Sequence, residues 1–236
     1  MQQRQAPVRV VVVYYSRFGV VEQLARHVTE GARRVEGVDV ELLEVEDQPI
    51  EELRPGETET AMALRRAAVV NQLAEADALV VGAPGYFGSM ASPMKRFFED
   101  CATSSSPPAT DRTRPWRHHL FYNKVGAAFT STGTPHGGSE ETLHSILTMF
   151  MHLGMIIVTP GQQPPILVDE SAPYGATAIS GPEGDRLPTT EEQEAARNLG
   201  QQVAEQATWF GLGYAEWARL RDLRRRQAAR GAERPF

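Results

Sequence analysis

The chain has 236 residues, 41% of them hydrophobic, which predicts one α/β domain with a sizeable core. A net charge of −6 argues against a nucleic-acid partner, no Cys/His cluster has the spacing of metal ligands, and no apolar run approaches the ~18 residues of a membrane span. The only cysteine, Cys101, excludes an intramolecular disulfide and is expected to be a structural thiol, and with no leader before the first strand we expect a cytoplasmic protein.

The predicted elements alternate between strands and helices. Short, nearly continuous apolar runs indicate strands buried on both faces, and apolar residues at helical spacing indicate helices that pack on a sheet. The predicted strands span 8–15, 38–45, 78–83, 125–130 and 155–158. The predicted helices span 21–35, 61–74, a segment carrying Met94, Phe97 and Phe98, 140–153, and a last helix from about Thr189. This order predicts a doubly wound, five-stranded parallel sheet with helices on both faces.

Three predicted strands end in loops of small or hydroxyl residues, at 16–19, 84–89 and 131–138. The carboxyl ends of parallel strands converge at a switch point, where such loops can surround a planar ligand and its phosphate. The helix start after Ser16 offers free N–H groups to an anion, although for this loop alone an ordinary serine-capped turn is the alternative. Neither GxGxxG nor GxxxxGK[ST] occurs, so a flavodoxin-type mononucleotide site is favoured over a dinucleotide site or a P-loop.

Five motifs, in this order, resemble those of the tryptophan-repressor-binding protein (WrbA) family, flavodoxin-like NAD(P)H:quinone oxidoreductases. The motifs are YYSRFG (14–19), GAPGYFGSM (82–90), FTSTGTPHGG (129–138), MHLGM (151–155) and PYGATAISGPEGDRLP (173–188). The resemblance covers residues 8–207. It implies a flavodoxin-like fold, one FMN per subunit, two-electron reduction of a quinone by NADH or NADPH, and a homotetramer, a dimer of dimers, whose active sites are built from several subunits.

The resemblance also implies the residues of the site. It assigns FMN binding to Ser16, Arg17, Phe18, Gly19, Val20, Val21, Pro84, Gly85, Tyr86, Phe87, Ser131, Thr132, Gly133 and Thr134. It places His152 at the flavin site, from the same or a neighbouring subunit, as the catalytic acid or electrostatic group. Phe18 and Trp116 are the residues expected to contact the substrate. The family commonly has Thr-Arg-Phe at 85–87 and a second histidine at 153, so Tyr86 removes a cation and Leu153 leaves His152 without that neighbour.

The long excursions after the second, third and fifth predicted strands would cover a bound flavin and favour an enzyme over an electron carrier. A flavodoxin-like carrier and a flavin-free interaction or scaffold protein remain the alternatives. We divide the chain into an FMN-binding domain, 1–207, and a helical basic extension, 208–236. Residues 211–236 carry seven arginines against three carboxylates, a balance of +4, which leaves −10 for the rest. This tail is interpreted as a solvated helix end or as a contact with an anionic partner, a membrane surface or a neighbouring subunit.

Overall fold

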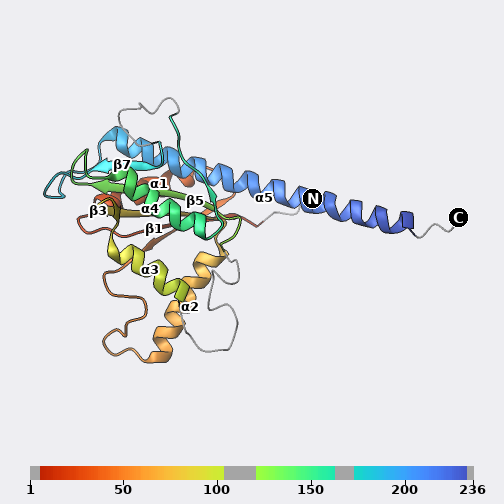
Figure 1. Cartoon of the computed structure of the whole chain (residues 1–236), viewed down its shortest axis with the longest axis horizontal. Coiled ribbons are helices and arrows are strands. Elements are labelled where there is room, and N and C mark those ends of the chain that lie inside the picture. Colours follow the sequence, from red (N-terminus) through yellow and green to blue (C-terminus); the bar gives the residue numbers. More distant parts are fainter. Residues whose placement is uncertain (1–5, 104–120, 163–172, 233–236) are drawn as a thin grey trace.

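The computed structural model describes residues 6–103, 121–162 and 173–232 (Figure 1). The strands are β1 (Val8–Tyr14), β2 (Val38–Glu44), β3 (Ala78–Tyr86), β4 (Ser89–Met90), β5 (Val125–Thr132), β6 (Ile156–Ile157) and β7 (Ala176–Ile179). The helices are α1 (Val20–Ala32), α2 (Glu59–Glu75), α3 (Ser92–Thr103), α4 (Ser139–His152) and α5 (Thr190–Ala232).

The sheet is parallel along its main path, in the order β2-β1-β3-β5-β6. The alternation of side chains along β1 sends Val11 and Val13 into an apolar layer shared with α2, α3 and α4. Val10 and Val12 enter a second layer, shared with α1 and α5. Figure 1 shows α5 on one side of the sheet and α2 and α3 on the other. The predicted doubly wound α/β fold with helices on both faces is therefore confirmed.

The outer edge of the sheet differs from the prediction of five strands. The fifth position is occupied by two short strands, because β6 pairs with Val125 and Gly126 while β7 pairs with Phe129–Thr132 of the same β5. A further short strand, β4, folds back antiparallel on the end of β3. The segment 176–179 was missed because four residues inside a Pro/Gly-rich stretch carry too little periodicity to indicate a strand.

Helix α5 begins with a reciprocal N-terminal cap and extends far beyond the part that packs against the sheet and α1, here called the body together with the other elements. The Glu192 backbone N–H donates to Thr189 Oγ1 (3.2 Å), and the Thr189 N–H donates to Glu192 Oε2 (2.7 Å). The helix runs unbroken to Ala232, but burial ends at about Ala207 and the rest projects from the body (Figure 1). The division into 1–207 and 208–236 stays a prediction. Within the described residues, no helix has the length and hydropathy to cross a membrane.

Cys101 on α3 is buried, and burial raises the pKa of its thiol from about 9 to about 12. Unfolding therefore releases a proton at pH values between these two, so we expect the free energy of unfolding to fall as the pH rises from about 9 towards 12. Urea titrations across this range should show a shallower fall for Cys101→Ala. A native protein whose thiol reacts with a thiol reagent as fast as the denatured chain would contradict this account.

Candidate functional site

A pocket opens at the carboxyl edge of the sheet, where the loops after β1, β3, β5 and β7 meet. Its lining residues are Ser16, Arg17, Phe18, Val20, Val21, Pro84, Gly85, Tyr86, Ser131, Thr132, Gly133, Ser180, Gly181, Pro182 and Gly184. The loops after β1 and β3 approach each other because these strands are neighbours in the sheet, and β5 lies next to β3. This is the position at which open parallel sheets bind their ligands.

The loop after β1 is built to receive an anion. Gly19, the N-cap of α1, has φ +90°, a conformation that favours glycine, and its N–H donates to Ser16 Oγ (3.1 Å). No side chain caps α1, so the N–H groups of its first turn, including those of Val20 and Val21, are left for a ligand. The carboxylate of Glu22 in that turn pairs with Arg26 (2.6 Å). These features fit a phosphate.

The loop after β3 is a hairpin rather than an irregular Gly-rich loop. Gly85 and Tyr86 pair with β4, and the two turn residues, Phe87 and Gly88, both have positive φ (53° and 71°). Gly85 must lack a side chain, because a Cβ there would lie 2.5 Å from Thr142 Oγ1 on α4. A positive φ is costly for an aromatic residue, yet the Phe87 ring is held fully exposed at the tip.

The backbone strain at Phe87 leads us to expect that its replacement by glycine stabilises the protein. Phe87→Gly should raise the free energy of unfolding by about 1 kcal/mol, because glycine adopts a left-handed conformation without the Cβ clash. If Phe87 also contacts a ring bound beside the hairpin, the same variant should lose substrate or cofactor affinity. Urea unfolding and FMN titration measure the two effects. A less stable Phe87→Gly protein would show that the ring makes contacts that outweigh the strain.

The loops after β5 and β7 are tied together into one wall. The Ser180 N–H donates to the Thr132 carbonyl (2.8 Å), and Thr132 Oγ1 donates to the Thr134 carbonyl (3.0 Å). The Glu192 carboxylate accepts from the Ile179 N–H (3.0 Å) and from Arg186 Nη1 (3.1 Å), which anchors the end of β7 to the start of α5. The wall is therefore held by hydrogen bonds made within the chain.

Most of the residues predicted from the motifs meet in this pocket. Those that line it are Ser16, Arg17, Phe18, Val20, Val21, Pro84, Gly85, Tyr86, Ser131, Thr132 and Gly133. Gly19 shapes the first loop without lining the pocket, and neither Phe87 nor Thr134 lines it. Trp116 lies outside the described residues.

Sequence reasoning assigned no cofactor role to the loop after β7, which contributes Ser180, Gly181, Pro182 and Gly184 to the lining. The sequence does contain a feature that could have marked this loop as part of the pocket, because the Ser-Gly-Pro-Glu-Gly run at 180–184 has the same small-residue character as the other loops. A Cβ at Gly184 would lie 2.8 Å from the Phe18 ring, so the two loops are in close contact. The loop was missed because β7, the strand that places it, was not predicted.

His152 lies away from the pocket of its own chain. It is exposed at the last residue of α4, a helix that starts beside the carboxyl end of β5 and runs back towards the opposite edge. Fourteen helical residues span roughly 21 Å. The next strand, β6, pairs with the first residues of β5, which confirms that the chain has returned to the amino edge. His152 therefore does not join the residues that line the pocket of its own chain.

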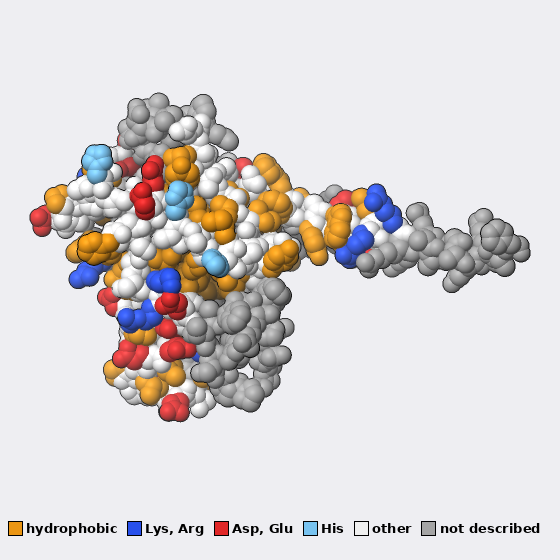
Figure 2. Space-filling view, viewed as in Figure 1, with side chains coloured by type: hydrophobic (Ala, Val, Ile, Leu, Met, Phe, Trp, Pro, Cys, Tyr) orange, Lys and Arg blue, Asp and Glu red, His pale blue; other side chains and the backbone are white. Residues whose placement is uncertain are grey.

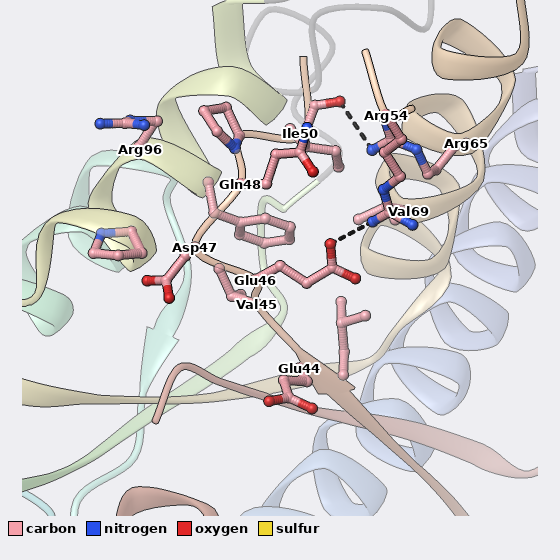
Figure 3. Close-up of a pocket in the computed structure, with 14 residues that line it drawn as sticks. Glu44, Val45, Glu46, Asp47, Gln48, Ile50, Arg54, Arg65, Val69 and Arg96 are labelled. Carbon is pink, nitrogen blue, oxygen red and sulfur yellow. Dashed lines mark hydrogen bonds and ion pairs between the residues drawn. The ribbon is translucent and has the colours of Figure 1, made fainter. Parts of the chain in front are cut away.

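A second pocket lies beyond β2, beneath the connection to α2 (Figure 3). It is joined to the first loop through Tyr15, whose hydroxyl donates to Asp47 Oδ1 (2.7 Å), and burial raises the pKa of Tyr15 to about 12. Arg54 pairs with Glu46 (2.6 Å), and Arg65 Nη1 donates to the Ile50 carbonyl (3.1 Å) (Figure 3). Both arginines have hydrogen-bond or ion-pair partners within the chain. The first pocket, here called the α1 pocket, instead presents the N–H groups at the start of α1 to a ligand, so we take the α1 pocket as the candidate site.

Comparison with known proteins gives three results. A family model described as NADPH-dependent FMN reductase matches residues 8–164. The NAD(P)H dehydrogenase (quinone) of Chromohalobacter salexigens is 40% identical over 210 residues, covering 84% of this chain and 96% of the relative. The protein of the same name from Acidovorax ebreus is 39% identical over 204 residues, with the same coverage.

Among solved structures, the fold is similar to that of a flavodoxin, WrbA-like protein from Agrobacterium tumefaciens, with a TM-score of 0.59 and 22% identity. That match covers 86% of this chain and 99% of the other. An archaeal flavodoxin matches with a TM-score of 0.52 and 20% identity, over 85% of this chain and 99% of the other. At these identities the structures establish the fold.

Proposed function

The chain belongs to the NADPH-dependent FMN reductase family, and we propose that it is an FMN-dependent NAD(P)H:quinone oxidoreductase. The relatives that share about 40% of its residues are named NAD(P)H dehydrogenase (quinone), which confirms the family expected from the sequence motifs. The observation that carries the proposal is the pocket itself, where four loops of small and hydroxyl residues meet at the uncapped start of α1.

The residues of this pocket fit FMN from its phosphate to its ring. The first-turn N–H groups of α1 and the Ser16 hydroxyl would hold the phosphate. Ser131, Thr132 and the backbone of Gly133 would bond the ribityl chain and the polar edge of the ring. Tyr86 lies where it would flank that ring. The loop 180–184 closes one side and would limit the access of water.

The chemistry that FMN supplies when bound is acceptance of a hydride from the nicotinamide donor and its delivery, with a proton, to the quinone. The protein's part is to bind, orient and exclude water. Phe18 and Tyr86 stand at the pocket mouth with 62% and 39% of their surfaces exposed, so each offers an aromatic face to a planar substrate. The Arg17 guanidinium lies 5.8 Å from the Phe18 ring centre and would supply a positive charge to an anionic donor bound at the pocket mouth.

The test is quinone-dependent oxidation of the nicotinamide by protein loaded with FMN. Rapid oxidation of NADH or NADPH that requires both a water-soluble benzoquinone and bound FMN is the expected result, and the donor that is consumed faster identifies the preferred one. Protein that retains FMN but consumes neither donor in the presence of the quinone would refute the enzyme and favour an electron carrier. Protein that retains no FMN would favour a scaffold.

We further propose that the enzyme works as a homotetramer in which His152 reaches the flavin of a neighbouring copy. The position of His152 at the opposite edge from its own pocket supports this arrangement. His152→Ala should lower kcat by about 10²-fold, the contribution of a positioned acid. Mixed assemblies of His152→Ala and Ser16→Asp copies should regain activity that neither variant has alone. Failure of the mixture to regain activity would show that His152 does not act on the flavin of a neighbouring copy, and an unchanged kcat of His152→Ala would place it outside the reaction.

The cytoplasm stays our proposal for the location of the protein. The cysteine content supports this location. Proteins of oxidising compartments often carry disulfides, whereas this chain has one cysteine, which is buried, and so forms no disulfide of its own.

A further inference from the structure

The projecting part of α5, residues 208–232, here called the C-terminal rod, exposes a large apolar surface. Figure 2 shows hydrophobic side chains along this part of the helix, followed by arginines. The exposed large apolar residues are Trp209, Phe210, Leu212, Tyr214, Trp217, Leu220 and Leu223. The four aromatic side chains, each about half exposed, present roughly 400 Å² before the leucines are counted. A contiguous patch of this size is typical of an interface.

The apolar face of the rod continues the face by which α5 is buried in the body. Ala196 and Val203 are fully buried, and Phe210 and Trp217 follow at the same seven-residue interval but are exposed. A seven-residue apolar repeat is the spacing by which one helix packs on another. Burial along α5 ends near Ala207, so among the described residues no other element of the same chain covers the continuation of the repeat.

The rod also has a sequence that forms a poor isolated helix. Gly211 and Gly213 lie in its first turns, and within the described residues nothing lies within 4 Å of where their Cβ atoms would be. Each glycine costs about 1 kcal/mol relative to alanine in a helix interior, and most helical stability comes from tertiary packing of an apolar face. A rod of this composition needs a packing partner to stay helical.

The distribution of charge along the chain favours a second copy of the same chain as the packing partner of the rod. The end of the chain, 211–236, carries a balance of +4, and the remainder carries −10. A second copy of this chain therefore offers both an apolar rod and an acidic body. Two parallel rods would place their arginines side by side, whereas two antiparallel rods place each arginine-rich end against the acidic body of the partner.

We propose that the rods of two copies pack against each other in antiparallel orientation, centred near Gly213. Trp209, Gly213 and Trp217 follow one another at four-residue intervals on one face, so Gly213 leaves a gap between two indole rings. A two-fold axis at Gly213 sets Trp209 of one copy opposite Trp217 of the other. Arg221 lies 4.8 Å from the Trp217 ring centre and covers the end of this apolar stretch. The pairing is independent of the flavin pocket and of the activity proposed for it.

Disulfide cross-linking of the full-length chain tests the pairing. Native Cys101 is buried, so a cysteine placed on the rod is the reactive one. Gly213→Cys should form a covalent dimer roughly 100-fold faster than the matched control Ala215→Cys on the opposite face, because pairing raises the local thiol concentration from micromolar towards millimolar. Trp209→Glu with Trp217→Glu in the Gly213→Cys chain should abolish the fast reaction, and Ala215→Glu should not. Equal rates for Gly213→Cys and Ala215→Cys would overturn the proposal.

Orientation is tested by mixing two single variants. Trp209→Cys and Trp217→Cys chains should cross-link with each other faster than either does with itself, and faster self-linking would overturn the antiparallel arrangement. A membrane surface is the competing partner for a basic amphipathic helix. Sedimentation with vesicles of phosphatidylcholine and phosphatidylglycerol should leave the protein in solution. Vesicle binding that Trp209→Glu with Trp217→Glu abolishes, together with slow cross-linking at Gly213→Cys, would assign the rod to lipid.

Discussion

Ser16→Asp is expected to weaken FMN binding by roughly 10³-fold. The new carboxylate would face the phosphate across about 4 Å, and at the effective dielectric of a protein surface two such charges repel by about 4 kcal/mol. Aspartate can still accept the Gly19 N–H that Ser16 Oγ accepts at 3.1 Å, so the loop should keep its shape. Fluorescence titration with FMN measures the effect.

Ser16→Asn is the matched control, because asparagine has nearly the same shape as aspartate without the charge. We expect it to cost about tenfold or less, the loss of one hydrogen bond. Riboflavin, which lacks the phosphate, should bind the aspartate and asparagine variants equally. If both variants bind FMN equally, the phosphate lies elsewhere and the orientation of the ligand in the pocket is wrong.

Gly200→Ala is expected to lower the free energy of unfolding by about 3 kcal/mol or more. A Cβ at this position would lie 1.9 Å from the carbonyl oxygen of Val28, and Gly31 on α1 meets the Arg197 carbonyl just as closely. Because the clash is with backbone, relief requires α1 and α5 to move apart, and the buried contact between them opens. Urea denaturation provides the measurement.

Gly211→Ala is the control within the same helix. Nothing among the described residues lies within 4 Å of a Cβ there, so alanine should raise stability by about 0.5 to 1 kcal/mol through helix propensity alone. A Gly200→Ala protein as stable as Gly211→Ala would mean that α1 and α5 are not packed backbone to backbone.

The sequence predicts the centre of this fold well because the central strands are unambiguous. The run from Val10 to Val13 is apolar on both faces, and only a strand covered by helices on both sides accommodates it. The strands at the edge of the sheet could not be predicted in the same way. Residues 176–179 form a strand only because β5 extends far enough beyond β6 to pair with them, which is a tertiary effect that no local pattern announces.

In the candidate site too, some features follow from the local sequence and others depend on the tertiary structure. The local strand, turn and helix pattern predicts Ser16 as a candidate anion-binding residue, because helix starts that bind anions have a local signature, whereas Gly19 was assigned from the family resemblance. The left-handed Phe87 could not, since aromatic residues rarely adopt that conformation and only the closure of the β3–β4 hairpin enforces it. The place of His152 depends on the direction of α4 relative to the sheet, so motif matching alone left open which subunit it serves.

We propose above that the α1 pocket holds FMN that passes electrons from a nicotinamide to a quinone. The visible absorbance of the FMN-loaded protein tests this proposal when it is followed without oxygen, first after addition of NADH or NADPH and then after addition of a benzoquinone. We expect one FMN per chain, bleaching of the bound flavin by the nicotinamide, and full return of its colour with the quinone. Bound flavin that stays oxidised with both donors, or bleached flavin that the quinone does not reoxidise, would contradict it.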